Sequence, residues 1–162
     1  ARDTGLGIKL KLYQRELLLQ QGVHTARWTF DPLVAKNAHI NLNRLGAVVV
    51  EHVENMYGDS NSTLHAGLGT DRFVVEWRLA DEQVARVIAG LENAGRKPSP
   101  GSPVRIEIPA DIYDVLEHAP HEAVEWRART RAAFRQHLAQ GYRVTTFARD
   151  PVSGRCVYGL AR

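Results

Sequence analysis

The chain has 162 residues, of which 44% are hydrophobic and 24% charged, with a formal net charge of +3. This balance predicts a soluble globular protein of one domain, or one domain with a small appendix. No apolar run reaches the length of a membrane-spanning helix, and the first residues lack the apolar stretch of a secretory signal. The single cysteine, Cys156, cannot form an internal disulfide, so we expect a reducing, cytoplasmic location.

The weakly basic composition, with a pI of about 9.2, suits phosphate-bearing ligands. It does not favour nucleic acid, because Lys and Arg are spread along the whole chain. His118 and His121 stand three residues apart, but Pro120 separates them and no third ligand is evident. We therefore expect no bound metal and no membrane contact.

Hydrophobic periodicity predicts alternating helices and strands in the first half of the chain. Ile8 and Leu12 share a helical face, and Trp28 and Phe30 point to the same side of a strand. The predicted helices cover residues 5–21, 33–45 and 82–91, and the predicted strands cover residues 24–30, 47–53 and 72–79. Gly22 and Gly46 are placed to end the first two helices, and Asp31-Pro32 to open the second.

Residues 93–103 are rich in Pro, Gly and Ser and form the best linker in the chain. They separate a first unit, residues 1–92, from a second, residues 104–162, that packs on or completes the first unit's sheet. The second unit is predicted to have strands over 104–108, 142–147 and 155–160 and helices over 111–118 and 121–140. The fold class is therefore α/β, with a mixed, largely antiparallel sheet and flanking helices.

Four arginines, Arg127, Arg129, Arg131 and Arg135, spread around the longest predicted helix. With acidic residues beside them, they are typical of a solvated face. They could also meet an acidic substrate. Trp28, Trp77 and Trp126 fall at apolar positions and are predicted to lie in the core.

The clearest chemical motif is the turn Arg2-Asp3-Thr4-Gly5-Leu6-Gly7 before the first helix. Its glycines let the backbone approach a ligand closely. The free N–H groups and positive dipole end of the following helix favour a phosphate or pyrophosphate. Arg2 adds a positive charge.

Residues 1–79 resemble the GNAT superfamily of N-acetyltransferases. The resemblance is carried by the turn, by the helix after it, and by the run Trp28 to Ala47, which contains Leu45-Gly46 near its end. That family's signature is Gln/Arg-x-x-Gly-x-Gly/Ala at a helix start. The later helix around Trp126 and Phe134, with Gly141-Tyr142-Arg143-Val144, is similar to a little-characterised predicted acetyltransferase branch of the superfamily.

The resemblance implies an acyl-CoA-dependent N-acyltransferase, with acetyl-CoA or another acyl-CoA as co-substrate and an amine of unknown identity as acceptor. The predicted coenzyme A site comprises Arg2, Asp3, Thr4, Gly5, Leu6, Gly7, Ile8 and Asn37. The backbone amides from about Thr4 to Ile8 would hold the pyrophosphate. Asn37 would lie near the pantetheine.

This chain departs from the family pattern in three ways. The family's Asn position is Ala35, and Asn37 is two residues late. The position of the family's proton-donating Tyr is Leu42, so Tyr57 is the candidate general acid. No strands precede Ala1, so we expect either a fragment of a longer protein or a fold completed elsewhere, by the second unit or by another subunit in a homo-oligomer.

Candidate bases for deprotonating an acceptor amine are Glu51, Glu54, Glu76, His52 and His65. Each also suits a surface or strand-end position. The alternative function is a non-catalytic module that binds coenzyme A or a nucleotide with a GNAT-like fold. Leu42 and the missing first strands favour that alternative.

Overall fold

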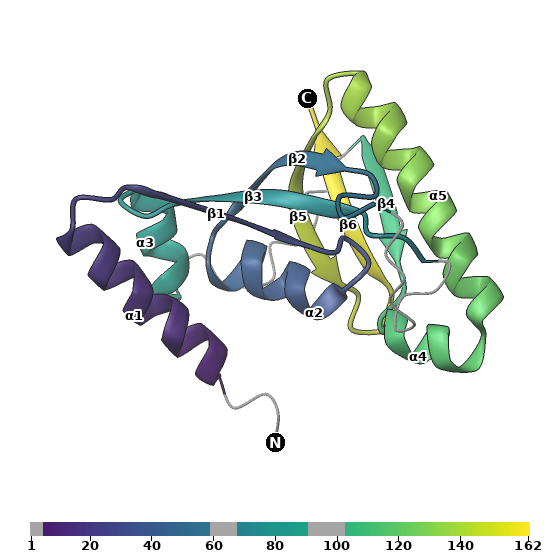
Figure 1. Cartoon of the computed structure of the whole chain (residues 1–162), viewed down its shortest axis with the longest axis horizontal. Coiled ribbons are helices and arrows are strands. Elements are labelled where there is room, and N and C mark those ends of the chain that lie inside the picture. Colours follow the sequence, from purple (N-terminus) through teal and green to yellow (C-terminus); the bar gives the residue numbers. More distant parts are fainter. Residues whose placement is uncertain (1–4, 59–67, 91–102) are drawn as a thin grey trace.

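The computed structural model describes residues 5–58, 68–90 and 103–162. Arg2, Asp3, Thr4, His65 and most of the predicted linker lie outside these ranges. The helices are α1 (Leu6–Gln20), α2 (Ala35–Ala38), the π-helix η1 (His39–Arg44), α3 (Glu82–Ile88), α4 (Ile112–His118) and α5 (Pro120–Ala139). The strands are β1 (Thr25–Phe30), β2 (Val48–Val53), β3 (Arg72–Arg78), β4 (Val104–Ile108), β5 (Arg143–Arg149) and β6 (Cys156–Ala161). Figure 1 shows their arrangement.

The described strands form two antiparallel sheets of three strands each, in the orders β1-β3-β2 and β4-β6-β5. The α/β class is therefore confirmed, but the expected single mixed sheet is not found in this part of the chain. Each sheet is built around a central strand, β3 or β6, that pairs on both sides. The edge strands β2 and β5 contact each other without forming a ladder, so the sheets stay separate.

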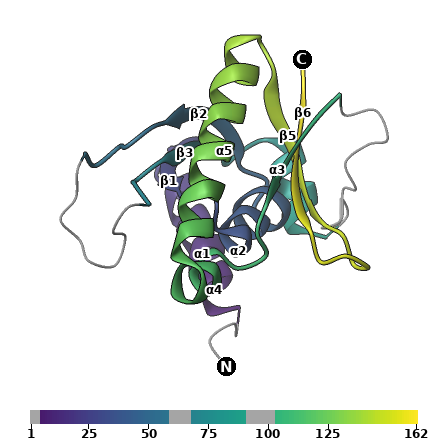
Figure 2. The same cartoon turned by 90° about the vertical axis from the view of Figure 1, so that its right-hand side faces the viewer.

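One face of the first sheet is buried because β3 alternates as predicted. Phe73, Val75 and Trp77 are fully buried on that face. The indole Nε1 of Trp77 donates to the carbonyl oxygen of Leu45, 2.7 Å away, and so ties the sheet to the end of η1. Figure 2 shows the two sheets on opposite sides of α2, with α5 running across the front.

An aromatic cluster joins the two sheets at the centre of the core. Phe73 from β3 meets Phe134 of α5 at 4.8 Å and Tyr158 of β6 at 5.4 Å between ring centroids. The Tyr158 hydroxyl donates to the carbonyl oxygen of Pro32 at 2.7 Å, a contact across 126 residues of sequence. Both units predicted from the sequence thus contribute to one hydrophobic core.

The segment after β1 differs from the single helix predicted over residues 33–45. It begins at Ala35 as an α-helix and widens to a π-helix at His39. Asp31 accepts from the backbone N–H of Leu33 instead of capping a helix directly. In the wider part Asn41 is buried, and its side-chain oxygen accepts from Trp28 Nε1 at 3.2 Å. Gly46 ends the helix at a positive φ of 72°, as expected.

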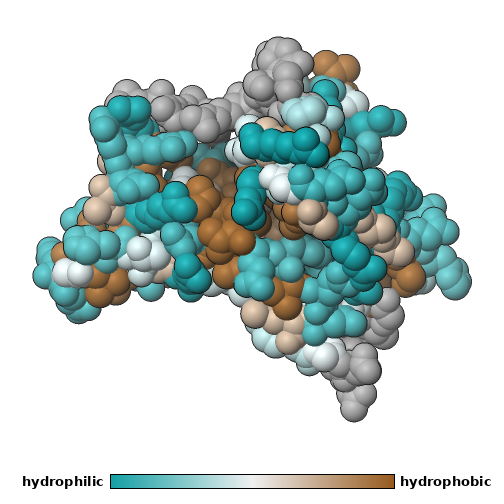
Figure 3. Space-filling model, turned by 90° about the horizontal axis from the view of Figure 1, so that it is seen from above, coloured by the Kyte–Doolittle hydropathy of each residue, from teal (hydrophilic) through white to brown (hydrophobic). Residues whose placement is uncertain are grey.

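Seen from above, hydrophobic residues gather in a hollow near the middle of the molecule, surrounded by hydrophilic ones (Figure 3). Val49 of β2 and Val144 of β5 are only partly buried against the core. In the described part of the chain, no helix has the length and apolar character that crossing a membrane would require.

Candidate functional site

The described part of the predicted phosphate turn, Gly5 to Gly7, lies at the start of α1. Gly5 is the N-cap residue, and its φ of 76° lies in the left-handed region that favours glycine. A Cβ at Gly5 or Gly7 would meet no atom within 4 Å, so the space in front of the turn is open on the side of the described residues. No described side chain caps the helix, and its first turn contains no acidic residue. The N–H groups of Leu6, Gly7 and Ile8 are therefore available to an anion.

Asn37 and Tyr57 lie on other elements. Asn37 is exposed in α2, on the segment that follows β1. Tyr57 is 62% exposed in the turn after β2, where the Arg72 guanidinium lies 5.5 Å from the centre of its ring. Among the described residues, no hydrogen bond or ion pair connects either side chain with the first turn of α1.

Most of the candidate bases are held by other groups. Glu54 pairs with Arg135, and Glu76 pairs with Arg27 and Arg78. His52 packs against the rings of both Phe73 and Phe134. Glu51 is exposed on β2 and makes no ion pair with another described residue. It is the most accessible carboxylate of the predicted set.

Two of the four arginines of α5, Arg127 and Arg131, do not lie on a solvated face, which corrects part of the sequence-based interpretation. Arg127 is 3% exposed and binds both carboxylate oxygens of Asp31 at 2.9 and 2.6 Å. One turn later, Arg131 binds both oxygens of Asp71 at 2.7 and 2.8 Å. Arg135, one turn further, pairs with Glu54. Arg129 and Arg135 are exposed, as expected, and Arg129 stacks on Trp126.

These three pairs, here called the arginine row (Arg127–Asp31, Arg131–Asp71 and Arg135–Glu54), clamp α5 to the strand ends of the first sheet. Asp31 follows β1, Asp71 precedes β3, and Glu54 follows β2. Bidentate arginine–carboxylate geometry fixes position as well as charge. The row therefore positions α5 and leaves its arginines with carboxylate partners within the protein.

The same surroundings shift the pKa values of buried Asp71 and half-buried His52. Burial alone would raise the pKa of Asp71, but hydrogen bonds from Arg131 and the Asn55 backbone, with the nearby arginine charges, lower it overall. Burial is the main cause that lowers the pKa of His52, and the charges of Arg127 and Arg131 add to it. Asp71 is thus held charged and His52 neutral near pH 7.

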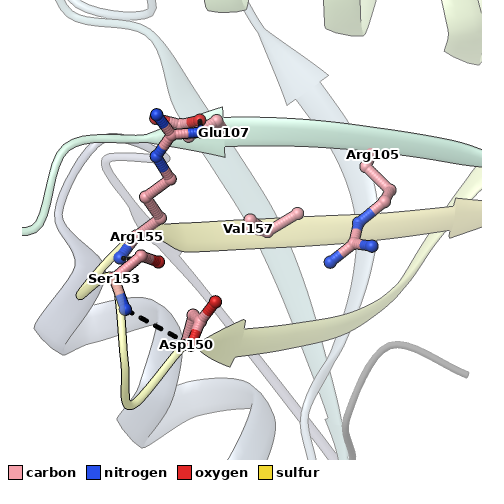
Figure 4. Close-up of a pocket in the computed structure, with 6 residues that line it drawn as sticks. All are labelled: Arg105, Glu107, Asp150, Ser153, Arg155 and Val157. Carbon is pink, nitrogen blue, oxygen red and sulfur yellow. Dashed lines mark hydrogen bonds and ion pairs between the residues drawn. The ribbon is translucent and has the colours of Figure 1, made fainter.

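A shallow polar pocket lies on the second sheet (Figure 4). Its cavity volume is about 320 Å³, and its lining residues are Arg105, Glu107, Asp150, Ser153, Arg155 and Val157. Arg155 lies 3.7 Å from Glu107, and Asp150 accepts from the backbone of the β5–β6 turn. The opposite charges are mostly paired locally, so the pocket does not favour one charge of ligand.

A second cavity, of about 370 Å³, lies between α2 and the second sheet. Lys36, His39 and Arg149 line it together with Ala35, Ala110, Phe147 and Cys156. Burial lowers the pKa of His39, and burial raises the pKa of the Cys156 thiol. The lining of the cavity is therefore basic, and it includes Lys36, which precedes Asn37 in the sequence.

Sequence reasoning missed Asn41, Asn43 and the partners of the arginine row. Asn43 donates to the carbonyl oxygen of Phe147 at 3.0 Å and so links η1 to β5. The arginine row did leave a signal, because Arg127, Arg131 and Arg135 recur every four residues and share one helical face. Carboxylates at three strand ends completed the pattern.

Comparisons of the chain with protein-family models, with curated proteins and with solved structures found no match.

Proposed function

We propose that this protein binds an acyl-coenzyme A, most simply acetyl-CoA, at the start of α1 and transfers the acyl group to an amine. The observation that carries the proposal is the conformation of Gly5, which is left-handed, faces open space and leads into an uncapped helix. A pyrophosphate is the group of coenzyme A that such a turn suits. The Arg2-x-x-Gly5-x-Gly7 pattern and the order α1, β1, α2 support this choice.

Electrostatics on α1 favour an anionic ligand. The helix presents its positive dipole end at Leu6, and Lys9 is exposed within the second turn. Lys11 is directed inward, with its ammonium 4.0 Å from the centre of the Trp28 ring. Lys9 is therefore the described lysine best placed to add charge beside a bound phosphate.

The proposed chemistry is direct attack of a neutral amine on the thioester carbonyl. The new C–N bond forms as the C–S bond breaks, the amine loses a proton and the departing thiolate gains one. In this proposal Tyr57 supplies a proton to the thiolate. Glu51 is the carboxylate free to accept the proton of the amine, directly or through water.

A second candidate is a non-catalytic module that binds coenzyme A or a nucleotide. It is favoured by the separation of the turn from the candidate acid and base. In Figure 1 the start of α1 lies at the lower side of the molecule, whereas β2, which carries Glu51 and leads to Tyr57, lies at the upper side. Binding at α1 does not require either residue.

Isothermal titration with acetyl-CoA tests the binding step. We expect binding by the intact protein, weakened at least about tenfold by Gly7→Glu, because the new carboxylate would cap the free N–H groups and repel phosphate. Gln14→Glu is the matched control, since it adds the same charge two turns later on the same exposed helix. No binding by the intact protein, or equal weakening by both variants, contradicts the proposal.

Release of free coenzyme A with a panel of amines separates the two candidates. Turnover that falls at least about tenfold in Tyr57→Phe, with unchanged acetyl-CoA affinity, supports the transferase. Clear binding with no thiol release across the panel supports the binding module instead.

A further inference from the structure

The outward face of α1 is apolar and has no partner among the described residues. Leu6 and Leu10 are each 60% exposed, Tyr13 is 65% exposed and Leu17 is 39% exposed. Their spacing is four, three and four residues, the repeat of one seam of a coiled coil. A seam of this kind is unusual on a helix that faces only water.

The inward face of the same helix packs against the protein through a different set of side chains. Ile8, Leu12, Leu18 and Leu19 pack against the core. Arg15 donates from Nε to the carbonyl oxygen of Leu79 at 3.0 Å, and Lys11 lies over Trp28. The exposed seam is therefore not left over from poor docking of α1, because a different set of side chains holds the helix to the protein.

The charges beside the seam indicate what could cover it. Lys9 and Glu16 flank the seam on one side, one residue before Leu10 and Leu17 respectively, and both are exposed. On the other side stand Gly7 and Gln14, which carry no charge. If a second α1 lies antiparallel, Leu6 meets Leu17 of the other helix and Leu10 meets Tyr13. Lys9 then faces the second copy's Glu16, and Glu16 faces its Lys9.

A parallel pairing does not bring Lys9 next to Glu16 of the second copy. Each charged flanking residue would instead lie near the same residue of the second copy or near an uncharged residue. The antiparallel arrangement also obeys two-fold symmetry, which makes both ion pairs from the same two residues. Among the described residues, Glu16 has one ion-pair contact, to Arg15 at 3.7 Å. Its side chain is 65% exposed and remains able to take a second cation.

We propose that two copies of this chain associate through α1, antiparallel and two-fold symmetric, with the Leu6, Leu10, Tyr13 and Leu17 seam at the centre and Lys9–Glu16 pairs at its border. A seam of four side chains per copy is small for a protein interface. The dimer is therefore expected to dissociate at about 10–100 µM. The association is measured without ligand, so its test is independent of coenzyme A binding.

Sedimentation equilibrium of the intact chain from about 5 to 500 µM gives the dissociation constant, the range being set by the expected affinity. Lys9→Glu and Glu16→Lys should each weaken the dimer about ten- to thirtyfold, because two attractive contacts become two repulsive ones. The double variant Lys9→Glu with Glu16→Lys should restore affinity to within about threefold, since the charges are exchanged but still complementary.

Leu10→Ser should abolish the dimer, while Val152→Ser leaves it unchanged. Val152 is a suitable control because it is 93% exposed and lies in the β5–β6 turn. A monomer throughout the concentration range overturns the proposal, as does binding of a different chain or segment along α1 that leaves the protein monomeric. A dimer that ignores the single charge reversals, or one that the double variant fails to restore, also overturns it.

Discussion

The two longest helices are held to the protein in opposite ways. α5 has 20 residues and buries Ala123, Arg127, Thr130 and Phe134, whereas α1 has 15 residues and buries none. α5 is fixed by the arginine row and by the aromatic core. α1 rests on partly buried aliphatic side chains and one arginine hydrogen bond. The comparison indicates that α5 supports the fold, whereas α1 leaves its first turn and an apolar seam exposed among the described residues.

The largest effect is expected from Arg127→Met. The change leaves Asp31 without its buried partner and the Leu68 carbonyl without the Arg127 Nε donor at 2.7 Å. We expect a loss of about 3–5 kcal/mol in the free energy of unfolding, as for other broken buried ion pairs. Urea titration followed by tryptophan fluorescence measures it. Arg129→Met is the control from the same helix and should cost less than about 1 kcal/mol. Equal losses would show that α5 is not fixed by its buried pairs.

Asp71→Asn should have the next largest effect, about 2–3 kcal/mol, because the charged hydrogen bonds to Arg131 are lost. The pKa of Asp71 is lowered in the folded protein. Its contribution is therefore complete above the unfolded pKa of about 3.9 and is lost as the pH falls through the lower folded value. The variant should thus lose less stability than the parent between about pH 4 and pH 2. If the free energy of unfolding falls equally with pH in the variant and the parent, Asp71 does not cause the acid dependence.

The positions of the helices and strands could be predicted from the sequence, but the pairing of the strands and the partners of the arginine row could not. The described helices and strands lie close to their predicted ranges, because apolar periodicity and the glycines at 22 and 46 are local signals. The division into two sheets was missed, since it depends on which strands pair across long stretches of chain. The arginine row was missed for the same reason, because Asp31 and Asp71 are far from α5 in sequence.

In the candidate site, too, local conformation could be predicted from the sequence, whereas the relative positions of the residues could not. Gly5 adopts the left-handed conformation that the glycine turn allowed for, and this freedom could be read from the residue type alone. The positions of Asn37 and Tyr57 relative to that turn depend on tertiary structure and could not be derived from spacing. The buried role of Asn41 depends on the π-helix, for which apolar periodicity gives no signal.

His52 gives a pH test of the core beside α5. Burial lowers its pKa, so the neutral ring is favoured in the folded protein. Its stabilising contribution is present above the unfolded pKa of about 6.5 and declines as the pH falls below it. His52→Phe should reduce the loss of stability between pH 7 and pH 5 in urea titrations. Part of the loss should remain, because the pKa of His39 is lowered as well. An unchanged pH dependence would contradict the assignment to His52.

The smallest effect is expected from Leu10→Ser on α1. Because this side chain is 60% exposed and points away from the core, the free energy of unfolding should change by less than about 0.5 kcal/mol. The measurement is made at about 1 µM protein, below the expected dissociation constant of the dimer. A larger loss would mean that α1 stabilises the single chain through this face, which would remove the contrast with α5.

The position of β6 between β4 and β5 has a consequence for biosynthesis. β4 and β5 both precede β6 in the chain, yet neither pairs with the other, and both ladders require β6. During translation these two strands therefore have no hydrogen-bonding partner in their sheet until β6 leaves the ribosome. Tyr158, carried by β6, also completes the aromatic core of the first sheet. The pairing of β4 with β6 and the packing of Tyr158 on the first sheet join residues far apart in sequence, so we expect both to be late, whereas β5 and β6 form a local hairpin.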